Sequence, residues 1–217
     1  MCGISGIFNF NGAPVDAKQV SEMNRIILHR GPDGNGVFAE NNVGIGSTRL
    51  AMIDLREIAN MPLYDTENRF VIVFNGEIYN YIEVGNELKK KGYKFHTDSD
   101  TEVVINAYKE WGEDCLHKLN GMWAFAIWDK QEKTLFCSRD RFGIKPLYFY
   151  KDDNRLIFGS EIKQILSCGI DKTVNDNTIY DYLVFNFIDH TENTFYKNIT
   201  KVQAGHKFTI PFVVPQR

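Results

Sequence analysis

The sequence has no long apolar run and no strong charge of either sign. Its 217 residues are 43% hydrophobic and 24% charged, as in an ordinary globular protein. No apolar stretch approaches the ~20 residues that a membrane span needs, and the first residues lack the basic segment of a secretory signal. We therefore expect no membrane association and no secretion. The length suits one large domain, or one domain with an appendage.

Charge and the spacing of cysteine and histidine exclude further classes. A net charge of −3 gives no reason to expect nucleic acid or an anionic membrane as a partner. The four cysteines and five histidines are scattered, without C-x-x-C or metal-ligand spacing. The composition predicts a reduced, cytoplasmic protein without structural disulfides and without a metal site.

The cysteine at position 2 has unusual chemistry. Removal of Met1 would leave Cys2 with a thiol and a free α-amine a few bonds apart. Their unperturbed pKa values are near ~8.5 and ~8, so one residue would hold a nucleophile and the base that activates it. Taken alone, a cysteine in this position is more often simply the start of a strand.

Apolar patterning and capping residues predict a mixture of strands and helices. Strands are expected at 4–9, 36–39, 43–50 and 70–74, in hairpins of 122–128 with 135–138 and of 146–150 with 156–158, and in a last segment before the end. Helices are expected after Asp16, Asn80, Ser99 and Asn175, and over 160–166. The hairpin-like connections of the second half favour an α+β fold over alternating βαβ units.

Polar residues follow several of these strands. No second strand follows Asn75-Gly76, so we place this pair at a strand-to-helix junction, where an amide and a backbone N–H could form an oxyanion hole. Arg49 at a strand end would offer a planar fork for a carboxylate. Asp100 lies in the first turn of a predicted helix. Taken alone, Arg49 and Asp100 are each explained by an ordinary structural role.

Six short motifs occur in one order along the chain. They are Cys2-Gly3-Ile4, Arg30-Gly31-Pro32-Asp33-Gly34, Arg49-Leu50, Asn75-Gly76-Glu77-Ile78-Tyr79-Asn80, Ser99-Asp100-Thr101-Glu102, and the run from Arg139 to Tyr148. In this order, from Cys2 to about Gly205, the chain resembles the glutaminase (class II glutamine amidotransferase) domain of glutamine-hydrolysing asparagine synthetases. The resemblance implies an α+β fold of the N-terminal-nucleophile hydrolase type. That fold is a four-layer αββα sandwich, with two largely antiparallel sheets between helical layers.

The resemblance also implies roles for individual residues. Cys2 would attack the side-chain amide of glutamine and form a thioester, with its α-amine as proton shuttle, and Asn75 and Gly76 would stabilise the oxyanion. The implied substrate-binding residues are Arg49 for the α-carboxylate, Glu77 and Asp100 for the α-ammonium, and Leu50, Met52 and Ile53 along the same pocket. The loop 30–34 would border the pocket. Residues 139–148 would form a structural hairpin near an interface.

One part of the family pattern is absent. The sequence has no Ser-Gly-Gly-x-Asp-Ser loop for the pyrophosphate of ATP. We expect residues 2–170 to be the glutaminase domain, and residues 171–217 to be a C-terminal extension or linker toward a synthetase domain that this chain lacks. ATP and Mg²⁺ are expected only in that domain, and no cofactor in this chain.

The expected partners are glutamine and a synthetase domain, in cis or in trans, which would use the ammonia to amidate aspartate. A homodimer is compatible with this interpretation. One alternative function is a regulatory or partner-dependent glutaminase-like module with little activity alone. Another is an amidase for a different amide, which the residues that would hold a zwitterion disfavour.

Overall fold

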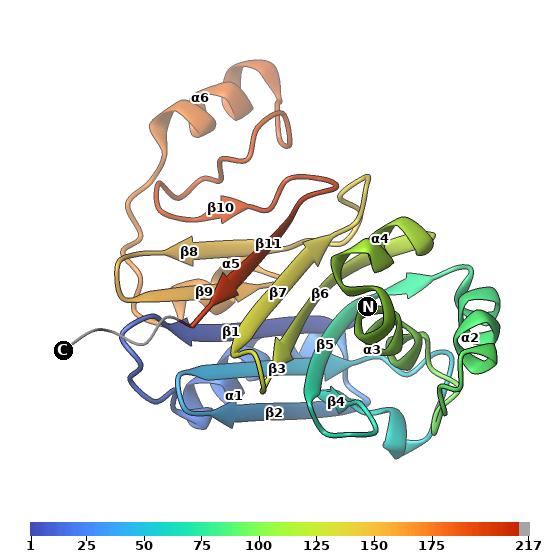
Figure 1. The fold of residues 1–217 in the computed structure, drawn as a ribbon. Coiled ribbons are helices and arrows are strands. Elements are labelled where there is room, and N and C mark those ends of the chain that lie inside the picture. The colour runs from blue at the N-terminus through green and yellow to red at the C-terminus, as the bar shows by residue number, and fades with distance from the viewer. Residues whose placement is uncertain (213–217) are drawn as a thin grey trace.

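Two antiparallel sheets form the centre of the molecule in the computed structural model, which describes residues 1–212. Sheet A has the strand order β10 (Thr200–Lys201), β8 (Tyr148–Lys151), β9 (Arg155–Gly159), β1 (Gly3–Asn9), β3 (Val43–Arg49) and β2 (Gly34–Glu40). Sheet B has the order β11 (Lys207–Pro211), β7 (Thr134–Arg139), β6 (Gly121–Asp129), β5 (Phe70–Ile78) and β4 (Leu63–Tyr64). Figure 1 shows the two sheets stacked on each other.

Helices cover the outer face of each sheet. On sheet A pack α1 (Ala17–Ile26) and α5 (Ile162–Leu166), and on sheet B pack α2 (Tyr81–Lys90), α3 (Asp100–Trp111) and α4 (Cys115–Lys118). Short 3₁₀ turns lie at Leu28–Arg30, Glu57–Ala59 and Gly112–Asp114. The layers run helix, sheet, sheet, helix, which confirms the predicted α+β sandwich.

The alternation of side chains along β5 decides which of them face sheet A. Val71 and Val73 belong to the core between the two sheets, whereas Ile72 and Phe74 belong to the core under α2 and α3. Asn75 continues the first series. Its side chain therefore faces the interior between the sheets, where β1 begins.

β5 is longer than predicted. Its pairing with β6 continues from Phe70 to Ile78, so Asn75-Gly76 lies inside the strand and the prediction of a strand-to-helix junction is wrong. The physical reason is the partner strand. The nine residues of β6 supply a hydrogen-bonding edge along the whole of this stretch, which the local sequence does not reveal.

The predicted helix caps are correct in three of four places. Asp16, Ser99 and Asn175 each accept a hydrogen bond from the first turn of their helix. Asn80 makes no such bond, because its amide bridges the Lys118 carbonyl and the Asn120 N–H at 2.9 Å each. The spacing of Ser99 and Glu102 also predicts a capping box, in which the Glu102 carboxylate would accept from the Ser99 N–H, but that N–H donates to Thr97 instead.

Glu102, the acceptor expected to close that capping box, bonds elsewhere. It accepts from the N–H groups of His96 and Thr97 in the segment before the helix. Its carboxylate thereby fixes the chain that enters α3.

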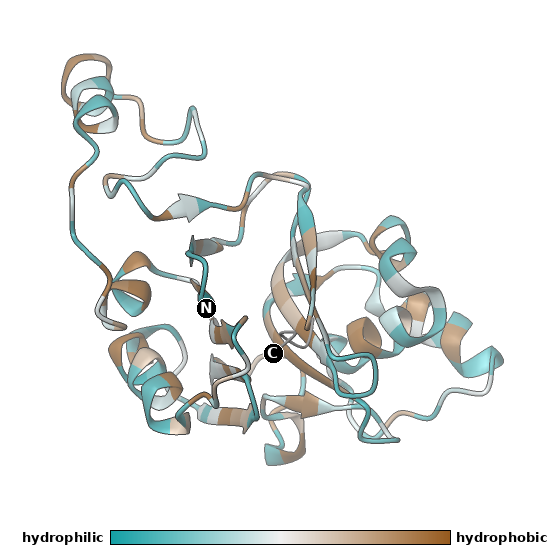
Figure 2. Ribbon diagram, turned by 60° about the vertical axis from the view of Figure 1, so that its left-hand side comes forward, coloured by the Kyte–Doolittle hydropathy of each residue, from teal (hydrophilic) through white to brown (hydrophobic). Residues whose placement is uncertain are grey.

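The last segment contributes an edge strand to each sheet. β10 pairs with β8, and β11 pairs with β7, while α6 (Asp176–Phe185) stands clear of the sandwich in Figures 1 and 2. The domain boundary near residue 170 stays a prediction, and residues 213–217 of the predicted extension lie outside the described residues. Within residues 1–212, no helix is long and apolar enough to cross a bilayer.

Candidate active site

A cavity of about 380 Å³ opens where β1, β3, β5 and the start of α3 come together. All nine site residues predicted from the sequence line it: Cys2, Arg49, Leu50, Met52, Ile53, Asn75, Gly76, Glu77 and Asp100. They come from four separate parts of the chain. The stacking of the two sheets brings them into one place.

Cys2 is held from several sides. Its Sγ lies 3.4 Å from the N–H of Leu50 and 3.6 Å from the Leu50 carbonyl oxygen, and its own carbonyl accepts from Arg30 Nε at 2.9 Å. Burial raises the pKa of the Cys2 thiol, against the opposing effects of the Leu50 N–H, the terminal amine and Arg49. The resting thiol is therefore neutral, and a base has to take its proton before it can attack.

Asn75 presents a buried amide with no acceptor. Its side-chain Nδ2 has no hydrogen-bond partner among the described residues, although Asn75 is only 1% exposed. A buried N–H donor without an acceptor costs roughly 1–3 kcal/mol. Because Asn75 lines the cavity, an oxygen atom of a bound molecule can supply the missing acceptor.

The N–H of Gly76 points toward the same cavity. In β5 the N–H groups of Phe74 and Ile78 point away from β6, to Met61 Sδ at 3.3 Å and to an Asp100 carboxylate oxygen at 3.0 Å. Backbone groups alternate along a strand, so Gly76 directs its N–H to this same edge. A Cβ at Gly76 would lie 2.4 Å from the Met122 carbonyl oxygen, which explains why this position is occupied by glycine.

Arg49 closes the other end of the cavity. Its guanidinium donates to the carbonyls of Arg56 and Asp54 and to Asn60 Oδ1. A guanidinium has five N–H donors, so two of them, on Nε and Nη2, have no acceptor among residues 1–212. These are donors that a carboxylate can take up as a bidentate pair.

Asp100 and Glu77 give the cavity an acidic side. Asp100 is buried at the start of α3, and its Oδ2 accepts from the Ile78 N–H. Burial raises the pKa of Asp100 to about 6, and the charge of Glu77 acts in the same direction. A cationic group between these two carboxylates would favour their ionised forms.

The loop 30–36 lies behind the cavity. None of its residues lines the cavity, and it borders the pocket only through the residues that it contacts. It supports the site indirectly: Arg30 holds Cys2, the Asp33 N–H donates to the Arg49 carbonyl, and the Asp33 carboxylate accepts from the Ala51 N–H. Its many turn residues allow this close approach, because a Cβ at Gly31 would lie 2.5 Å from the Arg49 backbone.

Sequence reasoning missed two charged residues of the cavity, Asp54, which is paired with Arg56, and Lys145. The sequence predicts only a structural role for the run 139–148. Arg139 and Asp140 do have that role: Arg139 donates to three backbone carbonyls, and Asp140 accepts from four N–H groups. This network also places Lys145 on the cavity wall. The only signal in the sequence was that a lysine interrupts an apolar turn.

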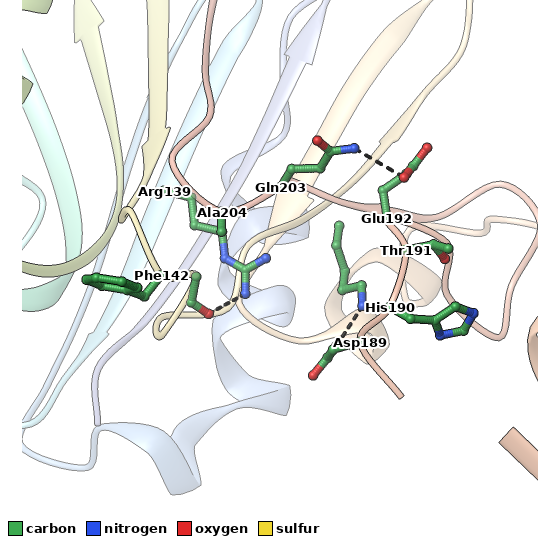
Figure 3. Close-up of a pocket in the computed structure, with 10 residues that line it drawn as sticks. Arg139, Phe142, Asp189, His190, Thr191, Glu192, Gln203 and Ala204 are labelled. Atoms are coloured by element: carbon green, nitrogen blue, oxygen red, sulfur yellow. Dashed lines mark hydrogen bonds and ion pairs between the residues drawn. The ribbon is translucent and has the colours of Figure 1, made fainter. Parts of the chain in front are cut away.

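A second cavity, of about 370 Å³, lies beside the turn 139–143 (Figure 3). Its charged and amide groups are already paired with one another: Lys201 with Asp189 at 2.6 Å, and Gln203 with Glu192 at 3.1 Å. Arg139 is bonded to backbone carbonyls there. These contacts connect the segment 189–204 with sheet B. The cavity offers no chemistry like that around Cys2.

Comparison with known proteins gives one consistent family. The profile of the glutamine amidotransferase domain matches residues 1–212. Asparagine synthetase [glutamine-hydrolyzing] 1 of Bacillus subtilis is 41% identical over 213 residues, which is 97% of this chain and 33% of that protein. A putative asparagine synthetase [glutamine-hydrolyzing] 2 of Methanocaldococcus jannaschii is 41% identical over 226 residues, or 94% of this chain and 43% of that protein. The chain thus spans less than half of these relatives.

A solved structure shares the fold. The glutamine phosphoribosylpyrophosphate amidotransferase of B. subtilis superposes with a TM-score of 0.67 at 22% identity, covering 77% of this chain and 44% of that one. At this identity the likeness concerns the fold alone.

Proposed function

This chain belongs to the glutamine amidotransferase domain family, and from that premise we propose that it hydrolyses the side-chain amide of glutamine through a thioester on Cys2. The observation that carries the proposal is the unpartnered Asn75 amide, which shares one cavity with Cys2 and with the outward N–H of Gly76. An oxyanion hole requires two such donors beside the nucleophile.

Cys2 begins the proposed reaction. With Met1 removed, the α-amine of Cys2 takes the thiol proton and Sγ attacks the amide carbon of glutamine. The carbonyl π electrons move to the oxygen, which accepts hydrogen bonds from Asn75 Nδ2 and the Gly76 N–H. As this intermediate collapses, the α-amine returns its proton to the departing nitrogen, and ammonia leaves.

Water completes the cycle. The free α-amine takes a proton from a water molecule, whose oxygen attacks the thioester carbon. The C–S bond then breaks, glutamate leaves, and Sγ recovers the proton. The net reaction consumes glutamine and water and yields glutamate and ammonia. As written, it uses this chain's own groups and water.

The amino-acid end of glutamine suits the opposite wall. Two N–H donors of Arg49 remain for its α-carboxylate, and Glu77 and Asp100 offer carboxylates to its α-ammonium. Leu50, Met52 and Ile53 line the space between. This arrangement selects a zwitterion over other amides, because an uncharged ligand would leave buried charges unpaired.

The ammonia would pass to a synthetase domain in cis or in trans. The curated relatives named above are called asparagine synthetases, and this chain covers only part of their length. We therefore propose aspartate as the acceptor, and assign ATP and Mg²⁺ to that further domain.

The test is ammonia release from glutamine by the 217-residue chain, after mass spectrometry has shown that its N-terminus is Cys2. The wild type is expected to release ammonia, Cys2→Ala to release none, and Cys168→Ala, which removes a thiol outside the cavity, to retain the activity. Hydroxylamine should trap the thioester as γ-glutamyl hydroxamate. Wild-type hydrolysis by Cys2→Ala would refute the mechanism.

Asn75→Ala tests the oxyanion hole. We expect kcat to fall roughly 10²- to 10³-fold. The free energy of unfolding should change by less than about 1 kcal/mol, because the variant also loses a buried donor that has no acceptor. A variant that keeps wild-type kcat would remove Asn75 from the mechanism.

A further inference from the structure

Two lysines are buried in the described part of the chain, Lys145 and Lys201. Lys201 is paired with Asp189 at 2.6 Å. Lys145 has no carboxylate within ion-pair distance among residues 1–212, and the one hydrogen bond of its Nζ within this range goes to the Met1 thioether sulfur, at 3.4 Å. A buried ammonium without an anion is unfavourable, so its retention on the cavity wall calls for an explanation.

The backbone of Lys145 is fixed on both sides. Its N–H donates to the Asp140 carboxylate at 2.9 Å, and its carbonyl accepts from Arg139 Nε at 2.8 Å. These two hydrogen bonds within the motif 139–148 thus fix the position from which the Lys145 side chain extends. Removal of Met1 would take away the thioether and leave the ammonium on the wall of the cavity that Cys2 also lines.

The charge of Cys2 acts on Lys145. Burial lowers the pKa of Lys145, and a negative charge on Cys2 raises it. The other charged groups that act on the pair are Arg30, Arg49, Glu77, Asp100, Asp140 and the terminal amine. Burial disfavours an isolated thiolate and an isolated ammonium, and their mutual attraction reduces both costs.

We propose that Lys145 is a positioning residue whose ammonium favours the anionic form of Cys2 Sγ and the neutral form of the Cys2 α-amine. The neutral amine is the form that accepts the thiol proton in the proposed reaction, and the thiolate left by this transfer is the form that attacks glutamine. Lys145 acts through Cys2 and is assigned no contact with substrate. This inference rests on the proposed function, because a role for the thiolate assumes that Cys2 is the nucleophile. The ionisation of Cys2 itself can be measured without turnover.

The test is alkylation of Cys2 by iodoacetamide as a function of pH, followed by peptide mass spectrometry in chains that start at Cys2. Only the thiolate reacts, so the midpoint reports the ionisation of the thiol. In Lys145→Met the midpoint should move up by about one pH unit, and the rate at lower pH should fall roughly tenfold. Lys145→Arg keeps the charge and should restore the wild-type midpoint.

A matched control is Lys172→Met, which removes one exposed positive charge outside the cavity lining. It should leave the midpoint unchanged. The acidic limb of kcat/KM for glutamine should move with the alkylation midpoint in Lys145→Met. Thermal unfolding shows whether each variant is folded, and Lys145→Gln replaces Lys145→Met if the latter is not.

Two results separate this inference from the proposed function. If wild-type protein hydrolyses glutamine and the midpoint is the same in wild type, Lys145→Met and Lys145→Gln, the role of Lys145 is refuted and the glutaminase stands. If the midpoint moves as expected but Cys2→Ala still hydrolyses glutamine, the role of Lys145 stands and the mechanism of hydrolysis is refuted.

Discussion

At the scale of single residues, three of the buried polar residues that line the cavity with Cys2 carry an energetic cost in the empty protein. Asn75 has an amide without an acceptor, Asp100 a carboxyl with a raised pKa, and Lys145 an ammonium without an anion. Each group lowers the stability of the empty protein. Together they match the amide oxygen, the ammonium and the thiolate of the proposed reaction, which is why the cost is concentrated here.

The pKa of Asp100 predicts how glutamine binding depends on pH. As pH rises through about 6, Asp100 ionises and gains attraction for the substrate ammonium. KM for glutamine should therefore fall by up to about tenfold between roughly pH 5 and pH 7. Steady-state kinetics on Asp100→Asn should show a higher KM without this step. The same step in Asp100→Asn would assign it to another group.

The same residue predicts an opposite effect on stability. The folded-state pKa of Asp100, about 6, lies above its ordinary value of 3.8. Its favourable contribution is thus complete below about pH 4 and is lost as pH rises through about 6. At neutral pH Asp100→Asn should be more stable than wild type, by up to about 3 kcal/mol in urea unfolding, and the difference should vanish in acid. A less stable variant at neutral pH would contradict this.

At the scale of elements, β5 and the loop 30–36 do most to build the site. β5 carries Asn75, Gly76 and Glu77 on successive positions, and alternation sends their side chains and N–H groups in different directions around one cavity. The loop packs its backbone against the end of β3, which carries Arg49. The position of Arg49 therefore depends on a contact between two backbones.

Gly31→Ala tests that contact. The new Cβ would lie 2.5 Å from backbone atoms of Arg49, which cannot move aside as a side chain can. We expect a loss of about 1–3 kcal/mol in urea unfolding and a raised KM for glutamine.

Gly85→Ala is the matched control, since its Cβ would lie 3.6 Å from a Val103 side-chain atom in ordinary contact. As a glycine inside α2, it should gain about 0.5–1 kcal/mol and keep the wild-type KM. Wild-type stability and KM in Gly31→Ala would show that the loop does not position Arg49.

At the scale of the whole molecule, three apolar cores separate four layers, and Met61 and Phe74 of the core between sheet B and its helices line the cavity. α3 is embedded, with eight of its twelve residues buried, whereas α6 has one buried residue out of ten. The sandwich and the projecting helix therefore differ in how much apolar packing protects their backbone hydrogen bonds.

Hydrogen exchange followed by mass spectrometry checks this difference. Peptides from β5, β6 and α3 should exchange at least about tenfold more slowly than the α6 peptide, because they open only when the cores are disrupted. The peptide that contains the 3₁₀ turn at 57–59 serves as a fast-exchanging reference within the same sample. Equal protection of α6 and α3 would mean that α6 is packed in solution in a way the structure does not show.

Local patterns in the sequence determined the elements and the identity of most site residues. The apolar runs form strands, and Asp16, Ser99 and Asn175 cap helices. The ordered motifs indicated one family and, through that family, roles for Cys2 and Asn75. These features depend on residues within a few positions of one another, so one-dimensional patterns carry them.

Tertiary structure alone decided which groups meet. Gly3 pairs with Thr48, and Ser5 pairs with Gly159. Lys145 is held at the cavity by the hydrogen bond from its N–H to the Asp140 carboxylate. The length of β5 through Asn75-Gly76 likewise depended on β6. Strand pairing and burial between distant segments are set by the packing of the whole chain, and no local periodicity encodes them.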